Sequence, residues 1–198
     1  MQNRLEEDRR RGVFVDITSA CAKLGDWKGA FDIAPYSWNS EECYYWIATH
    51  AVNAGRMDVA RKAAYPALAD IKAEDKRYTF SLSFPKVADL FLSLGDSSQA
   101  VALLRWSIEY LEKNTKMPGW VRINEFSNTA AVFIKMGNKA EALNLLHKAF
   151  ESVITEKDIP LKINELMKIT KVYVDHRLSV GDKELAYAED ILASCGKA

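Results

Sequence analysis

The sequence predicts an all-α protein, a solenoid of about five antiparallel helix pairs. Five of the nine glycines stand in the same surroundings along the chain. An aromatic residue stands eleven positions before four of these five glycines and begins an apolar stripe with helical spacing. No segment alternates apolar and polar residues convincingly enough to predict a strand. One helix pair cannot bury its apolar face alone, so the pairs are expected to stack on one another.

The recurring glycines mark the expected corners between paired helices. They are Gly25, Gly55, Gly95, Gly137 and Gly181. Each follows a mostly aliphatic residue, precedes a polar one and has an alanine five positions later. Glycine readily takes the left-handed conformation that ends a helix, and the Asp or Asn that follows four of them can cap the next helix. The pattern therefore predicts a helix, a corner and a second helix, five times over.

Apolar stripes precede the corners. The aromatic residues eleven positions before a glycine are Phe14, Tyr44, Phe84 and Phe126. Mostly apolar or small residues follow each ring three, four and seven positions later, as Ile17, Thr18 and Cys21 do in the first unit. In the fifth unit Thr170 stands where the ring is expected. We expect the rings of Phe84, Phe91, Phe126 and Phe133 to lie in the core.

The units are predicted to divide a single domain, 1–198, into repeats at roughly 3–38, 40–74, 77–115, 119–155 and 159–196. Successive glycines are 30, 40, 42 and 44 residues apart, a spacing typical of helical repeats. Pro35 is expected to end the second helix of the first unit early, and Pro66 and Pro85 to kink or shorten theirs. Pro160 fits the first turn of a helix.

The third and fourth units carry a family pattern: an aromatic residue, an aliphatic-small pair, a large apolar residue, Gly-Asp or Gly-Asn, and then Ala. The residues that carry it are Phe84, Val87, Ala88, Phe91, Gly95, Asp96 and Ala100, then Phe126, Thr129, Ala130, Phe133, Gly137, Asn138 and Ala142. Over roughly residues 12–195 the chain resembles a degenerate tetratricopeptide-repeat (TPR) protein. The resemblance implies a right-handed α–α superhelix whose first helices line a concave groove for a peptide or protein partner.

The expected groove residues stand nine, six and two positions before each glycine, on the side of the helix away from the apolar stripe. In the fifth unit these positions hold Val172, Asp175 and Ser179. The residues predicted to bind the partner are Tyr45, Trp46, Thr49, Asn53, Lys86, Asp89, Asn128, Lys135 and Lys171.

Two interpretations stay open for the groove residues. Trp46 either anchors a partner or packs over the gap beside Ala34 and Pro35. Lys86, Asn128, Lys135 and Lys171 either hold a carboxylate or peptide backbone, or form a solvated helix surface. The family's clamp for a C-terminal carboxylate is not expected, because Ser19, Thr49, Asp89 and Ala131 stand where it uses asparagine.

Charge and cysteine content narrow the classes of partner and compartment. The 27 basic side chains equal the 27 acidic ones, which does not favour nucleic acid or an anionic membrane. The run Arg9-Arg10-Arg11 follows Glu6, Glu7 and Asp8, which balance its charge. Cys21, Cys43 and Cys195 form no C-x-x-C pair, so we expect free thiols in the cytoplasm. A polar side on the expected last helix, 183–195, favours a terminal cap and therefore a monomer.

Catalytic motifs are missing from the sequence. His50, His147 and His176 belong to no metal-binding motif, and no phosphate-binding glycine loop or nucleophile elbow occurs. We therefore expect no catalysis, cofactor or metal, and a binding module that acts as an adaptor, regulator or scaffold. The alternatives are a single-stranded RNA-binding helical repeat, which needs a constant period and a basic groove, and a helical enzyme that no motif identifies.

Overall fold

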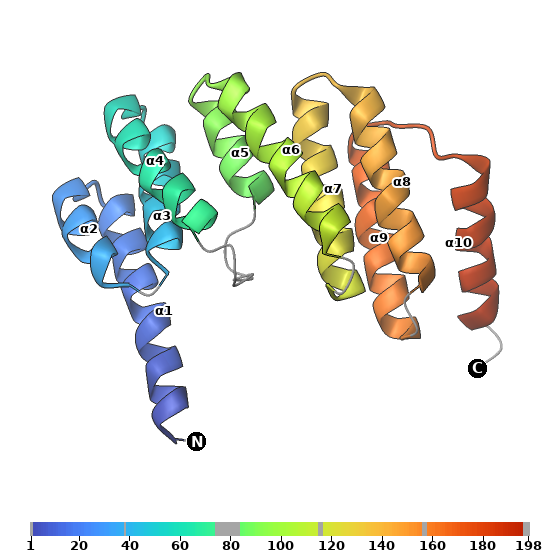
Figure 1. The fold of residues 1–198 in the computed structure, drawn as a ribbon, viewed down its shortest axis with the longest axis horizontal. Coiled ribbons are helices and arrows are strands. Elements are labelled where there is room, and N and C mark those ends of the chain that lie inside the picture. Colours follow the sequence, from blue (N-terminus) through green and yellow to red (C-terminus); the bar gives the residue numbers. More distant parts are fainter. Residues whose placement is uncertain (1, 38, 74–83, 115–116, 156–157, 196–198) are drawn as a thin grey trace. The chain divides into compact units, whose positions relative to one another are not determined.

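The all-α prediction is confirmed over the residues that the structure, a computed structural model, describes: 2–37, 39–73, 84–114, 117–155 and 158–195. No strand occurs among them. The elements are α1 (Gln2–Lys23), α2 (Trp27–Ile33), the short 3-10 helix η1 (Ala34–Tyr36), α3 (Ser40–Asn53), α4 (Met57–Ala73), α5 (Phe84–Ser93), α6 (Ser97–Lys113), α7 (Gly119–Lys135), α8 (Lys139–Thr155), α9 (Ile159–Asp175) and α10 (Asp182–Cys195) (Figure 1). None of the helices in these ranges has the length and apolar character that a bilayer crossing requires.

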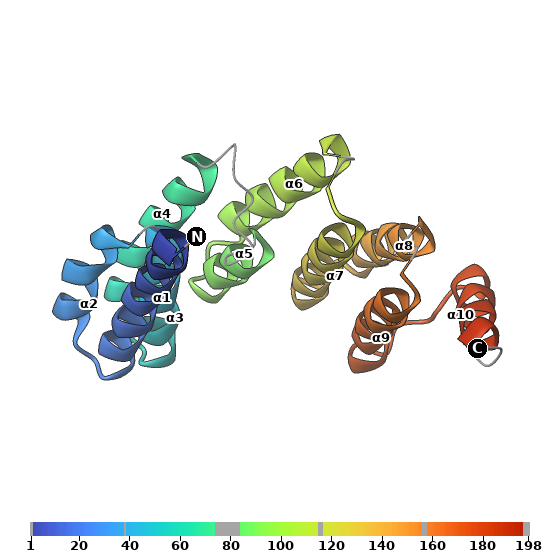
Figure 2. The ribbon, with the colours of Figure 1, turned by 90° about the horizontal axis from the view of Figure 1, so that it is seen from below.

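The helices belong to two compact units, residues 1–103 and 104–198. In the N-terminal unit α1 packs against α2 and α3, α3 packs against α4, and α5 contacts both α3 and α4. In the C-terminal unit α7 packs against α8, and α9 contacts both (Figure 2). The ring of Tyr187 on α10 meets that of Phe150 on α8, with centroids 5.7 Å apart. Within each unit, the first helix of one pair therefore contacts the first helix of the next.

Four of the five predicted corners are confirmed. Gly25, Gly55, Gly95 and Gly137 have φ angles of +82°, +70°, +79° and +80°. The residue after three of these glycines caps the next helix. The side chains of Asp26, Asp96 and Asn138 accept hydrogen bonds from the backbone N–H groups of Gly29, Gln99 and Glu141, at 2.9, 3.0 and 3.2 Å. In each of the first four pairs, the corner is therefore the point from which positions along the first helix are counted.

The fifth corner lies at Arg177, and its prediction at Gly181 is wrong. Arg177 has a φ of +51°, whereas Gly181 immediately precedes α10 and accepts the backbone hydrogen bond of Leu185. The N–H of Leu178 donates to the carbonyl of Tyr173 at 2.9 Å. At the fourth corner, Gly137, the residue after the corner makes the same backbone hydrogen bond to the carbonyl four positions before the corner. The fifth unit is therefore registered four residues earlier than the glycines indicate.

The corrected register restores the apolar stripe of the fifth unit. Counted back from Arg177, the positions eleven, eight and four residues earlier hold Leu166, Ile169 and Tyr173. All three are buried, with 8%, 0% and 4% of their surface exposed. Thr170 breaks the pattern only when the count starts from Gly181.

The aromatic core is confirmed, since Phe84, Phe91, Phe126 and Phe133 are all buried. The stripe of the first unit is not fully buried, because Ile17 is 42% exposed. The seven-residue α2 is too short to cover α1 along its length, and Pro35 follows in η1 as predicted.

Three of the later prolines, Pro66, Pro85 and Pro160, lie inside helices. Pro66 does not shorten α4, which continues to Ala73. Buried Ala63, Ala64, Ala67 and Leu68 surround Pro66, and their packing can offset the missing backbone hydrogen bond. Pro160 lies in the first turn of α9, as predicted. Pro85 is the second residue of α5, a position where proline is tolerated, while residues 77–83 of the predicted third unit lie outside the described part of the chain.

Candidate functional site

Matching polar stripes lie on α7 and α9 in the C-terminal unit. We call them the polar face: Asn124, Asn128, Ala131 and Lys135 on α7, and Asn164, Lys168, Lys171 and Asp175 on α9. The spacing i, i+4, i+7, i+11 places each set on one side of its helix. The two sets are in register when counted from Gly137 and Arg177. Lys168 Nζ donates to Asn124 Oδ1 at 3.3 Å, which joins the two stripes directly.

Two lysines of the polar face form ion pairs with neighbouring carboxylates. Lys168 Nζ also lies 2.6 Å from Oε1 of Glu165, a side chain only 2% exposed. Lys171 pairs with Asp175 at 3.0 Å, and both are well exposed. Asn128 and Lys135 are exposed. Amide and ammonium groups in this arrangement suit the carbonyl groups of an extended peptide and its carboxylates.

An aromatic cluster occupies the equivalent part of the N-terminal unit. The rings of Tyr45 and Trp46 meet with centroids 5.4 Å apart, and Trp46 stacks on His50 with centroids 5.9 Å apart. His50 Nε2 lies 3.1 Å from the hydroxyl of Ser19 on α1, so this cluster links the first helices of two pairs. Burial lowers the pKa of His50, and the nearby charge of Lys23 adds to the effect. Trp46 is half-buried, so part of its ring remains available at the surface.

The other predicted residues of the N-terminal unit lie on α3 and α5, two helices in contact. Thr49 and Asp89 are partly exposed, whereas Asn53 and Lys86 are exposed. Asn53 and His50 help to line an open pocket of about 390 Å³ between α3 and the end of α1. The predicted binding residues are thus divided between the units: Tyr45, Trp46, Thr49, Asn53, Lys86 and Asp89 in the first, and Asn128, Lys135 and Lys171 in the second.

Part of the polar face is not predicted from the sequence. Asn124, Asn164 and Lys168 were not predicted, and the count from Gly181 selected Val172 and Ser179 in error. Aligning the apolar stripes of α7 and α9, rather than their glycines, identifies the correct register.

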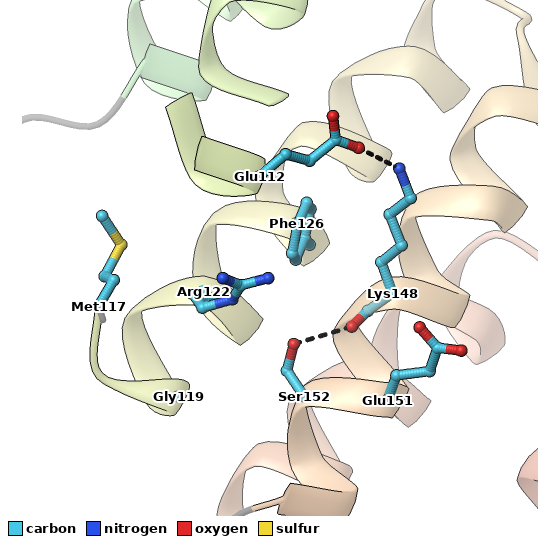
Figure 3. Close-up of a pocket in the computed structure, with 8 residues that line it drawn as sticks. All are labelled: Glu112, Met117, Gly119, Arg122, Phe126, Lys148, Glu151 and Ser152. Atoms are coloured by element: carbon cyan, nitrogen blue, oxygen red, sulfur yellow. Dashed lines mark hydrogen bonds and ion pairs between the residues drawn. The ribbon is translucent and has the colours of Figure 1, made fainter. Parts of the chain in front are cut away.

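A second feature of the C-terminal unit is an open pocket of about 540 Å³ (Figure 3). It lies between the end of α6, the start of α7 and the second half of α8. Lys148 Nζ and Glu112 Oε1, 2.5 Å apart, form an ion pair at its edge. The guanidinium of Arg122 lies 5.8 Å from the centroid of the Phe126 ring, within range of a cation–π contact. The pocket can accept a side chain with both apolar and polar parts, and no sequence motif marks it because its residues meet only through helix packing.

The titratable groups outside the polar face and the aromatic cluster mainly link or pack helices. His147 Nδ1 lies 2.8 Å from Glu184 Oε1, which links α8 to α10. The hydrogen bond from His147 holds the pKa of Glu184 below its usual value.

Burial raises the pKa of the Cys43 thiol, which makes it a poor nucleophile. Over the described ranges no three His, Cys, Asp or Glu side chains gather to hold a metal ion. The side chains of Arg9, Arg10, Arg11 and Cys195 lie outside the described part.

No protein-family model, curated protein or solved structure matches this chain.

Proposed function

We propose that the chain is a TPR-like α-solenoid and a protein–protein interaction module, with no catalysis of its own. It binds an extended segment of a partner along the outward sides of its first helices and so acts as an adaptor, regulator or scaffold. The observation that carries the proposal is the contact between neighbouring first helices within each unit, together with the recurrence of polar side chains at the same positions on them.

The packing within each unit supports the solenoid. α1, α3 and α5 form one series of neighbouring first helices, and α7 and α9 form another. In a stack of this kind, the outer sides of the first helices join into one continuous surface.

The side chains available suggest how a partner is held. Asn124, Asn128 and Asn164 can pair with the carbonyl and N–H groups of an extended backbone. Lys168 and Lys171, each with three N–H donors, can donate to its carbonyl oxygens beside their own ion pairs. In the N-terminal unit Trp46 offers a flat apolar surface for a large side chain of the partner, because aromatic residues often supply most of the binding energy. Free thiols at Cys21 and Cys43 fit the reducing cytoplasm proposed as its location.

Affinity capture with charge-altered variants tests the proposal. Asn128→Glu with Lys171→Glu places two negative charges on the polar face. Asn144→Glu with Lys139→Glu makes the same chemical change on exposed positions of α8. We expect the first double variant to lose partners that the wild type and the α8 variant both retain, with equal helicity by circular dichroism.

Two results would argue against this function. Identical partners for all three proteins would mean that the polar face does not bind them. Partners that disappear after ribonuclease treatment, together with tight and salt-sensitive RNA binding by the purified chain, would favour the RNA-binding alternative.

A further inference from the structure

One side of α9 is left uncovered. Ile163, Met167, Thr170 and Val174 share this side with the spacing i, i+4, i+7, i+11, and we call them the end stripe. Met167 is 63% exposed and Val174 is 67% exposed. Thr170 is also exposed, and Ile163 is half-buried. Two exposed apolar side chains, Met167 and Val174, thus lie two turns apart on one side of α9.

The same side of α1 is covered by a helix. Counted from the corners at Gly25 and Arg177, Met167, Thr170 and Val174 correspond to Val15, Thr18 and Ala22, which are 8%, 0% and 1% exposed. The neighbouring Ser19 contacts His50 at 3.1 Å, which places α3 along this part of α1.

The side is covered again on α7 within the other unit. Counted from Gly137, the end stripe corresponds to Ile123, Ser127, Ala130 and Ile134. The first three are buried, and α9 packs against this helix. An α-helix is therefore the element that this side receives wherever the chain supplies one. α10 does not take that place on α9, since its Glu184 and Tyr187 contact His147 and Phe150 of α8.

We propose that the end stripe is covered by α9 of a second copy of this chain, running antiparallel. The spacing of the stripe is symmetric about the midpoint between Lys168 and Ile169. A two-fold axis at that point brings Ile163 opposite Val174 of the second copy and Met167 opposite Thr170 of the second copy. Two-fold symmetric contacts between identical patches are the commonest form of self-association.

The flank of the end stripe suits the same pairing. Asn164 and Lys171 lie on one edge of it. In an antiparallel pair that edge meets itself, so the Asn164 amide oxygen of one copy accepts from the Lys171 ammonium of the other. No pair of like charges is brought together along this edge. The proposed contact packs one helix on another, as the α1–α3 and α7–α9 contacts within the chain do.

The size of the contact sets the strength to expect. One helix packed on one helix buries less than the roughly 1,200 Å² at which stable complexes begin, so a weak dimer is expected. The sequence-based expectation of a monomer considered the helix at 183–195. The uncovered stripe lies instead on α9.

Sedimentation equilibrium of the full chain, from about 1 to 300 µM, tests the proposal because a weak dimer forms within this range. Met167→Glu should weaken the dimer at least about tenfold, since a carboxylate would be buried against Thr170 of the second copy. Thr170→Leu should tighten it, because apolar area is added at the centre of the stripe. The matched control Ile154→Glu changes a residue that is 48% exposed on α8 and should dimerise as the wild type does.

Several results would overturn the dimer. A wild type that stays monomeric at the highest concentration leaves the end stripe to a helix from a different protein. Equal dimerisation by a folded Met167→Glu chain, or equal loss in the Ile154→Glu control, shows that the association does not use the end stripe. Thr170→Leu decides the matter independently if Met167→Glu fails to fold, since an unchanged or weaker dimer contradicts the proposal.

Discussion

The outward surfaces of the two units differ in chemistry although their helices share one register. Nine residues before the corner, α3 carries Trp46, α7 carries Asn128 and α9 carries Lys168. Trp46 belongs to an aromatic cluster with Tyr45 and His50, whereas Lys168 joins amide and carboxylate groups. The corners and the buried stripes set the backbone positions. The outward residues are free of that constraint, so their chemistry differs from helix to helix.

The largest effect should come from the core of either unit. Phe91→Ala in the N-terminal unit and Phe126→Ala in the C-terminal unit each remove a ring that is 1% exposed. Each substitution should lower the free energy of unfolding by about 3–5 kcal/mol, measured by urea denaturation. Tyr36→Ala is the control, because its side chain is 73% exposed and should change stability by less than about 0.5 kcal/mol. A loss near the control value for Phe91 or Phe126 would remove that ring from the core.

Much of the helical fold follows from sequence, because glycine corners and apolar stripes are local signals. The fifth corner did not, since Arg177 gives no local sign of a left-handed conformation, and Gly181 matched the pattern by standing before a helix. The candidate site was predicted only in part. The predicted residues Asn128, Lys135 and Lys171 lie on the polar face. Lys168 is not predicted, because a count from Gly181 instead of Arg177 selects positions four residues too late. Arg122 and Lys148 line the same pocket only because α7 and α8 pack together, which no spacing along the chain reveals.

The two corners of the C-terminal unit provide the next comparison. Gly137→Ala should cost about 1–2 kcal/mol, because a left-handed backbone strains any Cβ and no other atom lies within 4 Å to add a clash. Arg177→Gly should stabilise the chain by about 1 kcal/mol for the same reason. Thermal denaturation measures both. Equal effects of the same sign would contradict the register derived from Arg177.

Helix caps give a smaller effect in each unit. Asp26 accepts from the N–H of Gly29 at 2.9 Å at the start of α2, and Asp158 accepts from the N–H of Leu161 at 2.8 Å at the start of α9. Asp26→Ala and Asp158→Ala should each cost about 1 kcal/mol, measured by urea denaturation. Asn at either position keeps the acceptor and should remain close to wild type. A similar loss with Asn and Ala would assign the effect to charge rather than to the cap.

The units should also differ in their response to acid. Because burial lowers the pKa of His50, the unfolded chain binds its proton more tightly than the folded one. Its contribution to stability is therefore complete above its ordinary value of 6.5 and declines as the pH falls below it. The pKa of Glu184 is lowered by the hydrogen bond from His147, so its contribution is complete above 4.5 and is lost as the pH falls through the folded value.

Thermal denaturation measured from about pH 3 to about pH 8 separates the contributions of His50 and Glu184 to stability, because both groups titrate within this interval. His50→Gln should flatten the dependence below 6.5, and Glu184→Gln the dependence below 4.5. If each variant kept the slope of the wild type in its own interval, the assignment of these groups would be contradicted.

Hydrogen exchange of the chain with and without a captured partner tests the binding surface most directly. If the partner binds along the first helices, exchange should be slower in α7 and α9, and in α3 where the partner reaches the aromatic cluster, with α4 and α8 unchanged. Slower exchange confined to α4 or α8, with the first helices unaffected, would contradict it.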